Sequence, residues 1–375
     1  MNEDKANRYH RLRRRGLVAS LGVSVALFAL LMLTGASRTL RDLVATVSPS
    51  GALDTGGVAF YALWLGVCHE VLTLWPRVYL GRVERRYHPS ALPWRTWLAD
   101  HLKGTLLVLA LGPLGAVALY ALIARWPSQW WLAAGGLSAV LVLGAVRSGP
   151  AVLPWMAKVA PLTRPELRVR LERLAARAGA AVRVQQYRLG RGATRANAAL
   201  VGLGRTRRIL LSDRLLEDYS DDEIEVVLAH EIAHHVHKDI WKGLIGDVAM
   251  LQLGFFAASR ALASWGPAFG LQGPADVAGL PLVLLAGGAV TVSVAPVVNL
   301  WSRHHERRAD RFALELTQNP AAFISAVRRL GSQHLAERPS RLTALLFYSH
   351  PPVHERIASA NEAVRARRDL LDAAG

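Results

Sequence analysis

A long uncharged segment runs directly into a charged one late in the chain: residues 277–302 read VAGLPLVLLAGGAVTVSVAPVVNLWS, and residues 303–310 read RHHERRAD. About 20 mostly apolar residues are enough for a helix to cross the hydrocarbon core of a bilayer. The first segment therefore predicts a membrane span. The second predicts that this span ends in a polar stretch that carries histidines and acids at the membrane surface.

Five further segments are long and apolar enough to span a membrane, although Glu70 and Asp247 each place one acid inside a span. The first segment follows a basic start, as a secretory signal peptide does. It is too long for one, lacks a convincing small-residue cleavage site and precedes further spans, so we interpret it as a permanent span. The six expected spans are Gly16–Ser37, Thr55–Pro76, Gly104–Ala124, Trp126–Val146, Gly243–Ser259 and Val277–Ser302.

The overall composition agrees with a membrane protein that has basic aqueous parts. The 375 residues carry a formal net charge of +17, yet 52% are hydrophobic and only 19% are charged. This balance excludes an intrinsically disordered chain, which combines low hydrophobicity with high charge. The single cysteine, Cys68, excludes a disulfide framework and a cysteine-built zinc site.

Lysine and arginine are distributed unevenly between the loops, and this bias predicts the orientation of the spans. Positive charge is dense in 1–16 and 77–103 but sparse in 35–56 and 263–280. An even number of spans then places both termini, and the large polar segments that follow the fourth and sixth spans, in the cytoplasm, as expected for a multi-pass protein of a bacterial plasma membrane. We expect a four-span membrane domain over 1–148, a cytoplasmic domain formed by 149–241 and 303–375, and a two-span hairpin over 242–302.

The cytoplasmic domain is expected to be α+β, within a fold that is mainly α. Leucines at helical spacing predict a helix over Pro165–Ala178. Ser220 and Glu223 form a capping box that opens a helix through about Lys238. Short strands separated by glycine-containing turns are expected at Val182–Tyr187, Ala196–Leu203 and Arg208–Leu211.

The capped helix carries His230-Glu231-Ile232-Ala233-His234. Residues four apart share one face of a helix, so the two imidazoles can bind one metal ion. Glu231 is the residue after His230 on the helix, so its carboxylate can reach a water bound to that ion. Two histidine ligands with a carboxylate beside the bound water are the arrangement of a zinc hydrolase. The alternative is a histidine-rich polar face, because His235 and His237 follow.

A catalytic zinc usually has three protein ligands, and the polar end of the last span can supply the third. The hairpin formed by the last two spans would bring that end beside the histidine helix. Glu306 is then the natural third ligand, and Asp310, one turn on, can hold a ligand imidazole through its other nitrogen. In the alternative interpretation these acids only form ion pairs with neighbouring arginines. A His–His–Glu set suits zinc best among divalent metals.

These motifs resemble the membrane-embedded zinc endopeptidases of the CaaX prenyl protease type I family and, more distantly, the bacterial heat-shock membrane proteases. The resemblance rests on the histidine motif, on the pattern around the third ligand and on a His-Pro…Arg element. Further similar stretches extend it from about the second span onward. The pattern around the third ligand lies at 302–310 and the His-Pro…Arg element at 350–356, and the further stretches are 197–198, 208–216, 153–162, 79–84 and 100–103.

The resemblance implies a zincin-type domain that holds one Zn²⁺. Its ligands would be His230, His234 and Glu306, and Glu231 would be the general base. It also implies support from Asp310, and transition-state contacts from His350 and Arg356. A substrate peptide would add as a strand beside the segment that contains Asn197 and Ala198. Arg307 and the 85–88 loop depart from the family pattern, which puts specificity for prenylated substrates in doubt.

Other features of the sequence bear on alternative functions. The arginine-rich region 164–208 could bind nucleic acid, but no nucleic-acid motif or aromatic platform accompanies it. A surface facing anionic lipid headgroups accounts for it better. A protease that cleaves a regulator after a stimulus would need larger extracytoplasmic loops. A transporter or inactive scaffold would leave the competent metal set unexplained. Glu70 and Asp247 either line a hydrated chamber or reach the headgroups.

Overall fold

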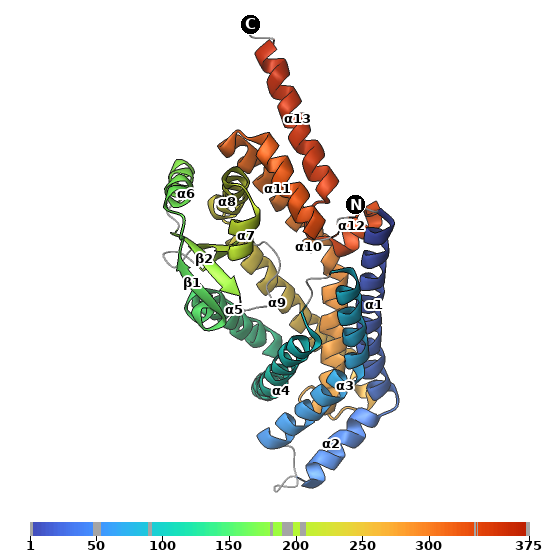
Figure 1. The fold of residues 1–375 in the computed structure, drawn as a ribbon. Coiled ribbons are helices and arrows are strands. Elements are labelled where there is room, and N and C mark those ends of the chain that lie inside the picture. The colour runs from blue at the N-terminus through green and yellow to red at the C-terminus, as the bar shows by residue number, and fades with distance from the viewer. Residues whose placement is uncertain are drawn as a thin grey trace. The chain divides into compact units, whose positions relative to one another are not determined.

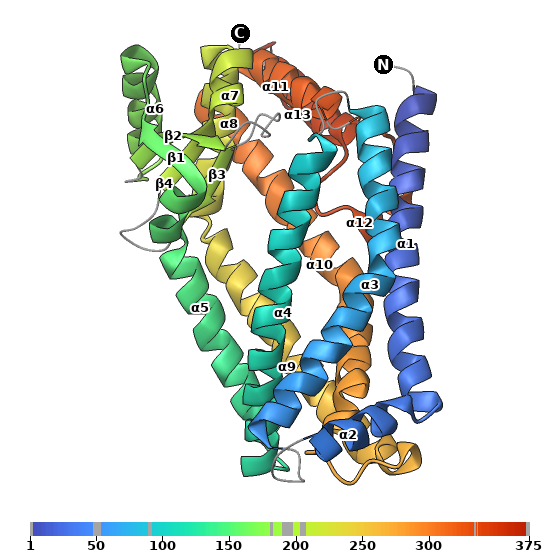
Figure 2. The same ribbon diagram turned by 60° about the horizontal axis from the view of Figure 1, so that its bottom comes forward.

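The structure is a computed structural model that describes residues 3–47, 54–88, 92–180, 183–189, 198–202, 208–333, 335 and 337–372. Helices make up most of these residues, as Figures 1 and 2 show, and a small sheet lies in the middle of the sequence. The mainly α fold with an α+β part is therefore confirmed.

Six helices are long and apolar enough to cross a membrane, in agreement with the expected spans. Each helix is longer than the apolar segment that predicted it, because the hydrogen-bonded helix continues into polar residues at one or both ends. The six helices are α1 (Glu3–Leu33), α3 (Thr55–Tyr87), α4 (Trp94–Arg125), α5 (Trp130–Met156), α9 (Asp239–Trp265) and α10 (Leu280–Thr317).

Local chemistry accounts for the ends of several spans. The carboxylate of Asp54 accepts a hydrogen bond from the Gly57 N–H and so caps the start of α3. Arg125 ends α4, and Pro127 lies in the turn before α5, where a proline costs no helical hydrogen bond. Gly35, with φ +75°, separates α1 from the short helix α2 (Ala36–Val47), which the sequence did not predict.

The chain folds into two compact units, each built from separate stretches of the sequence. The first consists of 1–8, 142–245 and 295–375, and the second consists of 9–141 and 246–294. The expected domains, 1–148, 149–241 with 303–375, and 242–302, stay a prediction about which parts fold independently.

The first unit contains a four-stranded sheet with the order β1-β2-β4-β3. β1 (Ala157–Pro161) pairs antiparallel with β2 (Arg183–Leu189), and β2 pairs parallel with β4 (Arg208–Ser212). β3 (Ala198–Val201) pairs antiparallel with β4, so that Ala198 lies opposite Leu211. β3 is therefore an edge strand, with one side free of strand partners among the described residues.

Helix α8 (Asp221–Val236) lies at the centre of this unit. Its capping box is confirmed, because Ser220 accepts from the Glu223 N–H while the Glu223 carboxylate accepts from the Ser220 N–H. Ile224, Leu228 and Ile232 are fully buried in the core of the unit. Helices α6 (Pro165–Arg177) and α11 (Pro320–Gln333) pack against α8, and the unit also contains α7 (Asp213–Asp218), α12 (Arg341–Phe347) and α13 (Val353–Asp372).

The second unit has its own apolar core, formed by α3, α4 and the neighbouring spans. Tyr61 and Ile123 are completely buried there, and Trp130 is 1% exposed. A buried ion pair also lies in this unit, where the Arg41 guanidinium donates to the carboxylate of Asp276. This ion pair fixes α2 to the connection between α9 and α10.

Candidate metal centre

The two motif histidines project from one face of α8. Their ring centroids lie 5.0 Å apart at an interplanar angle of 83°. Ala229, Ile232 and Ala233, on the other side of the helix, are fully buried. The apolar side therefore fixes the rotation of α8 and leaves the imidazoles to face α10.

Glu306 on α10 lies between the two imidazoles. Its Oε2 is 3.3 Å from His230 Nε2, and its Oε1 is 3.6 Å from His234 Nε2. Ligand atoms of these three residues all lie within 4.8 Å of one another. Because α10 continues without a break from the apolar segment into the charged one, it brings its first carboxylate to the histidine motif.

The other nitrogen of His230 is held by a carboxylate and an arginine. His230 Nδ1 is 3.0 Å from Asp310 Oδ1. Arg356, near the start of α13, donates from Nε to Asp310 Oδ2 at 2.8 Å and from Nη2 to Asp310 Oδ1 at 2.5 Å. This two-point contact fixes Asp310, so Arg356 is linked to His230 only through the carboxylate in these contacts.

A second carboxylate, which sequence reasoning missed, holds His234 in the same way. His234 Nδ1 is 3.0 Å from Asp239 Oδ2, and Asp239 is 9% exposed. The Arg308 guanidinium donates to Asp239 Oδ1, and Lys242 Nζ lies 3.4 Å from the same oxygen. The sequence feature that could have revealed Asp239 is its position, because it is an acid five residues after His234 and the first residue of the next helix.

Glu231 is placed beside these histidines and against the edge strand. Burial raises the pKa of its carboxyl, and the charge of Glu306 adds to the effect. The backbone N–H of Leu200 in β3 donates a hydrogen bond to it. A carboxylate with a raised pKa is a better proton acceptor than an ordinary one at neutral pH.

His350 completes the cluster from the loop between α12 and α13. Its Nε2 is 3.5 Å from Glu306 Oε1, and its side chain is 65% exposed. Arg303 on α10 anchors this loop by donating to the backbone carbonyls of Ala344 and Tyr348, at 2.7 and 2.5 Å. His350 is therefore the accessible member of the cluster.

The donor set fits a divalent ion. Glu306 Oε2 is buried and has no hydrogen-bond partner of normal geometry among the described residues, although His230 Nε2 is nearby. Burial lowers the pKa of His230, but Asp310 and Glu306 outweigh burial and raise it to about 9. The carboxylates thus favour positive charge at this point, and a metal ion can supply it in place of the proton.

The sequence-predicted residues are brought together to different degrees. His230, Glu231, His234, Glu306, Asp310, His350 and Arg356 converge within the first unit. Ala198 is the first residue of β3, whereas Asn197 lies outside the described residues.

Comparison with known families agrees with this fold. A model of peptidase family M48 matches residues 161–364, which is more than half of the chain. A second model, described as the CAAX prenyl protease N-terminal region with five membrane helices, matches residues 2–158. The chain therefore belongs to peptidase family M48, and it is an integral, multi-pass membrane metalloprotease.

Within 2–158, the described residues form four helices of spanning length, α1, α3, α4 and α5, together with the shorter α2. The name of the second model gives five membrane helices for this region.

Individual proteins extend the comparison along the chain. An uncharacterized metalloprotease, YhfN, of Bacillus subtilis is 29% identical over 91% of this chain and 81% of its own length. A CAAX prenyl protease 1 homolog of Oryza sativa is 27% identical over 71% of this chain and 64% of its own length. The crystal structure of S. mikatae Ste24p shares the fold, with a TM-score of 0.78 at 22% identity, over 95% of this chain and 88% of that one.

Proposed function

We propose that the protein is a zinc-dependent endopeptidase that hydrolyses peptide bonds of membrane-associated proteins or peptides. The observation that carries the proposal is the convergence of His230 Nε2, His234 Nε2 and Glu306 on one point beside the half-buried carboxylate of Glu231. Two imidazoles and one carboxylate are a known ligand set of catalytic zinc, and they leave one position open.

Each residue of the site has a distinct task in this reaction. When bound, zinc supplies a Lewis acid for water and for the substrate carbonyl. Glu231 accepts the proton of the attacking water and returns it to the leaving amine nitrogen. His350, exposed at the edge of the cluster, donates a hydrogen bond to the developing oxyanion. Asp310 and Asp239 keep the two ligand imidazoles oriented through their Nδ1 atoms.

The edge strand β3 supports binding of the substrate as an added strand. Its register with β4 pairs Ala199 with Leu210, while the Leu200 N–H is directed at Glu231. Neighbouring residues of a strand direct their backbone groups to opposite sides, so Ala198 and Leu200 face away from β4. A peptide paired along that side would lie next to the general base.

The distribution of positive charge bears on where the protein acts, and the departures from the CaaX protease pattern bear on what it cleaves. Lysine and arginine are concentrated in 1–16 and 77–103, which supports a cytoplasmic active site in a bacterial plasma membrane, at a surface with anionic headgroups. The CAAX prenyl protease 1 homolog of rice is a relative by sequence. We infer that prenylation is not required here, because Arg307 and the 85–88 loop depart from the CaaX protease pattern.

Glu231→Gln tests this function, because it keeps the shape of the side chain and removes the base. We expect Glu231→Gln to bind zinc as the wild type does and to lose peptide hydrolysis by about 10²–10⁴-fold. Glu225→Gln is the matched control: it lies on the same helix and pairs with Arg170 away from the cluster. Equal hydrolysis by Glu231→Gln and Glu225→Gln would refute the assignment.

The inactive Glu231→Gln variant can also trap substrates in native membranes for identification by mass spectrometry. We expect fragments of diverse membrane proteins. Recovery of prenylated C-terminal peptides alone would show instead that the protein is a dedicated CaaX protease.

A further inference from the structure

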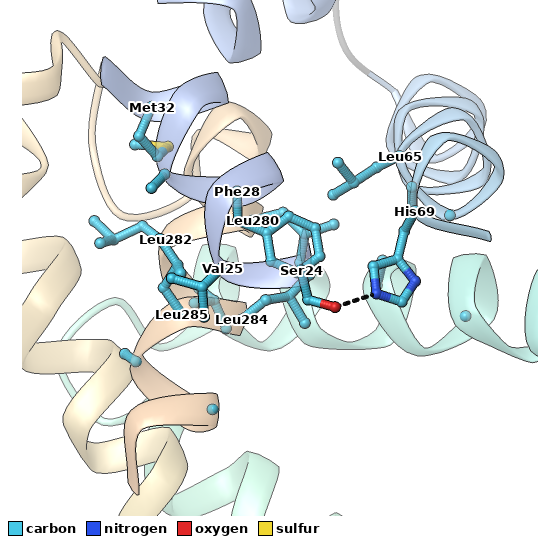
Figure 3. Close-up of a pocket in the computed structure, with 18 of the residues that line it drawn as sticks. Ser24, Val25, Phe28, Met32, Leu65, His69, Leu280, Leu282, Leu284 and Leu285 are labelled. Carbon is cyan, nitrogen blue, oxygen red and sulfur yellow. Dashed lines mark hydrogen bonds between the residues drawn. The ribbon is translucent and has the colours of Figure 1, made fainter. Parts of the chain in front are cut away.

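The second unit contains a large apolar cavity between its membrane-spanning helices, and the cavity is partly open to the outside of the helix bundle. Its volume is about 1220 Å³, which exceeds the range of about 300–1,000 Å³ that is typical of small-molecule pockets. Its wall is formed by side chains of α1, α3, α4, α9 and α10, and Figure 3 labels lining residues from α1, α3 and α10. Phe28, Leu65 and Leu282 are among the apolar groups that line it.

Small residues make the space. Gly112 and Gly115 on α4 and Gly288 on α10 line the cavity, and a Cβ atom added at any of them would meet no atom within 4 Å. Val25 and Val292 also line it and remain 47% and 52% exposed. The described chain therefore leaves a real void here, although close packing is the rule in protein interiors.

The cavity has the length of one membrane leaflet. It is lined on α1 from Leu21 to Leu33, a distance of about 18 Å at about 1.5 Å per residue. One half of a hydrocarbon core of about 30 Å is about 15 Å. The lining residues lie in the half of the spans that adjoins the connection through α2, because they include the end of α1 and the first half of α3.

Polar side chains on the wall already have partners in the protein. Ser24 Oγ donates to the Ser20 carbonyl at 3.0 Å, so the 2.9 Å contact between Ser24 Oγ and His69 Nε2 is donated by the imidazole (Figure 3). The Glu70 carboxylate accepts from both terminal nitrogens of Arg77 and, at 3.1 Å, from Thr105.

These contacts decide which chemistry can fill the cavity. Water needs two to four polar partners at each position, and the apolar wall does not supply them. An extended peptide would bring unpaired backbone N–H and C=O groups into hydrocarbon, which is costly. A hydrocarbon chain needs no partner, and the bilayer supplies such chains at very high local concentration.

We propose that this cavity is a binding site for a phospholipid of the adjoining leaflet, whose acyl chains enter between α1, α4 and α10. The lipid acts as a structural ligand of the second unit: it fills the space left by Gly112, Gly115 and Gly288, and its headgroup remains at the membrane surface. The Glu70 carboxylate then contributes to the fixed wall of a dry site, and not to a hydrated chamber.

The test compares a cavity-filling variant with a matched control. Gly112→Leu/Gly115→Leu places two side chains in the void, where the added Cβ atoms meet open space. Gly104→Leu makes one such change on the same helix outside the cavity, at another position where a Cβ atom meets nothing within 4 Å, and it is the matched control for each single substitution. Native mass spectrometry after extensive detergent washing reports retained phospholipid, and thermal unfolding reports its effect.

We expect the wild type and Gly104→Leu to retain phospholipid and the double variant to retain at least tenfold less. Phospholipid added back should raise the unfolding midpoint of the first two proteins and leave that of the double variant unchanged. Equal retention by the double variant and Gly104→Leu, or retention of a lipidated peptide in place of phospholipid, would overturn the proposal. If the double variant does not fold, the two single substitutions give the same comparison, with smaller losses expected.

Discussion

Asp239 Oδ2 lies 3.0 Å from His234 Nδ1, the nitrogen that faces away from Glu306. The Arg308 guanidinium holds the carboxylate from α10. Asp310 and Arg356 hold His230 by the same arrangement. Each motif histidine thus faces its own carboxylate through Nδ1, each carboxylate is held by its own arginine, and Nε2 of each imidazole lies on the side of Glu306.

Removal of the Asp239 carboxylate should weaken metal binding. We expect Asp239→Ala to reduce zinc affinity by about 10–100-fold, because the imidazole of His234 loses its orientation and basicity. Asp239→Asn should be affected less, since its amide oxygen can still accept from Nδ1. Competition with a chromophoric chelator measures the affinity.

Lys242→Met is the control for this prediction, because Lys242 contacts the same carboxylate at 3.4 Å and is not one of the three residues that could hold the metal. Zinc affinities of Asp239→Ala and Lys242→Met that match the wild type would show that the carboxylate has no role in metal binding.

Arg356 is expected to act through Asp310. Lysine cannot reproduce the two parallel hydrogen bonds that the guanidinium makes, so Arg356→Lys should lower zinc affinity and the hydrolysis rate together. In the background of Asp310→Asn the same substitution should have little further effect, because the partner is already altered. A rise in KM with unchanged zinc affinity would indicate a direct contact between Arg356 and the substrate.

The edge strand can be tested with proline. Ala198→Pro removes an outward-facing N–H and leaves the pairing of β3 with β4 intact. Loss of one substrate hydrogen bond of about 1 kcal/mol should lower kcat/KM about fivefold. Ala199→Pro instead interrupts the ladder and should lower the thermal unfolding midpoint. An unchanged kcat/KM for Ala198→Pro would argue against strand addition at this edge.

The pH dependence of stability should reveal the buried capping carboxylate of Glu223. Burial raises the pKa of this group, but hydrogen bonds from Ser325 and the Ser220 N–H, with the Arg329 guanidinium, outweigh burial and lower it. A lowered folded-state pKa gives stability that is fully present above the ordinary value of about 4.5 and is lost as the pH falls through the folded-state value.

Glu223→Gln should therefore destabilise metal-free protein by about 2 kcal/mol at pH 7, and the difference from the wild type should shrink as the pH falls below about 4.5. Thermal unfolding at a series of pH values measures it. Glu217→Gln, at an exposed pair with Arg214, serves as the control. A difference that stays constant down to pH 3 would contradict this account.

Long-range apolar patterns and short local motifs were the parts of the molecule that could be predicted. All six spans and the capping box at Ser220 follow from hydrophobicity and local hydrogen bonding, so they need no tertiary information. Strand β1 was missed because Lys158 and Pro161 lie within five residues and leave no strand pattern. Only its pairing with β2 makes it a strand.

The partners within the site were harder to predict. Asp239 looks like an ordinary first-turn acid of α9, and its contact with His234 depends on the turn at Lys238, whose φ is +58°. The cavity beside Gly112 depends on how five helices pack, which no single helix encodes. Glu306 was predictable because the helix periodicity and the apolar length of 277–302 together fix where it emerges.

Zinc dependence of peptide hydrolysis is tested most directly by removing the metal and restoring it. Chelation should abolish peptide hydrolysis by the purified full-length protein. Titration with Zn²⁺ should restore hydrolysis with an end point at one ion per chain, and Glu306→Gln should recover neither the stoichiometric binding nor the activity. Hydrolysis that survives complete removal of divalent metal would contradict the account.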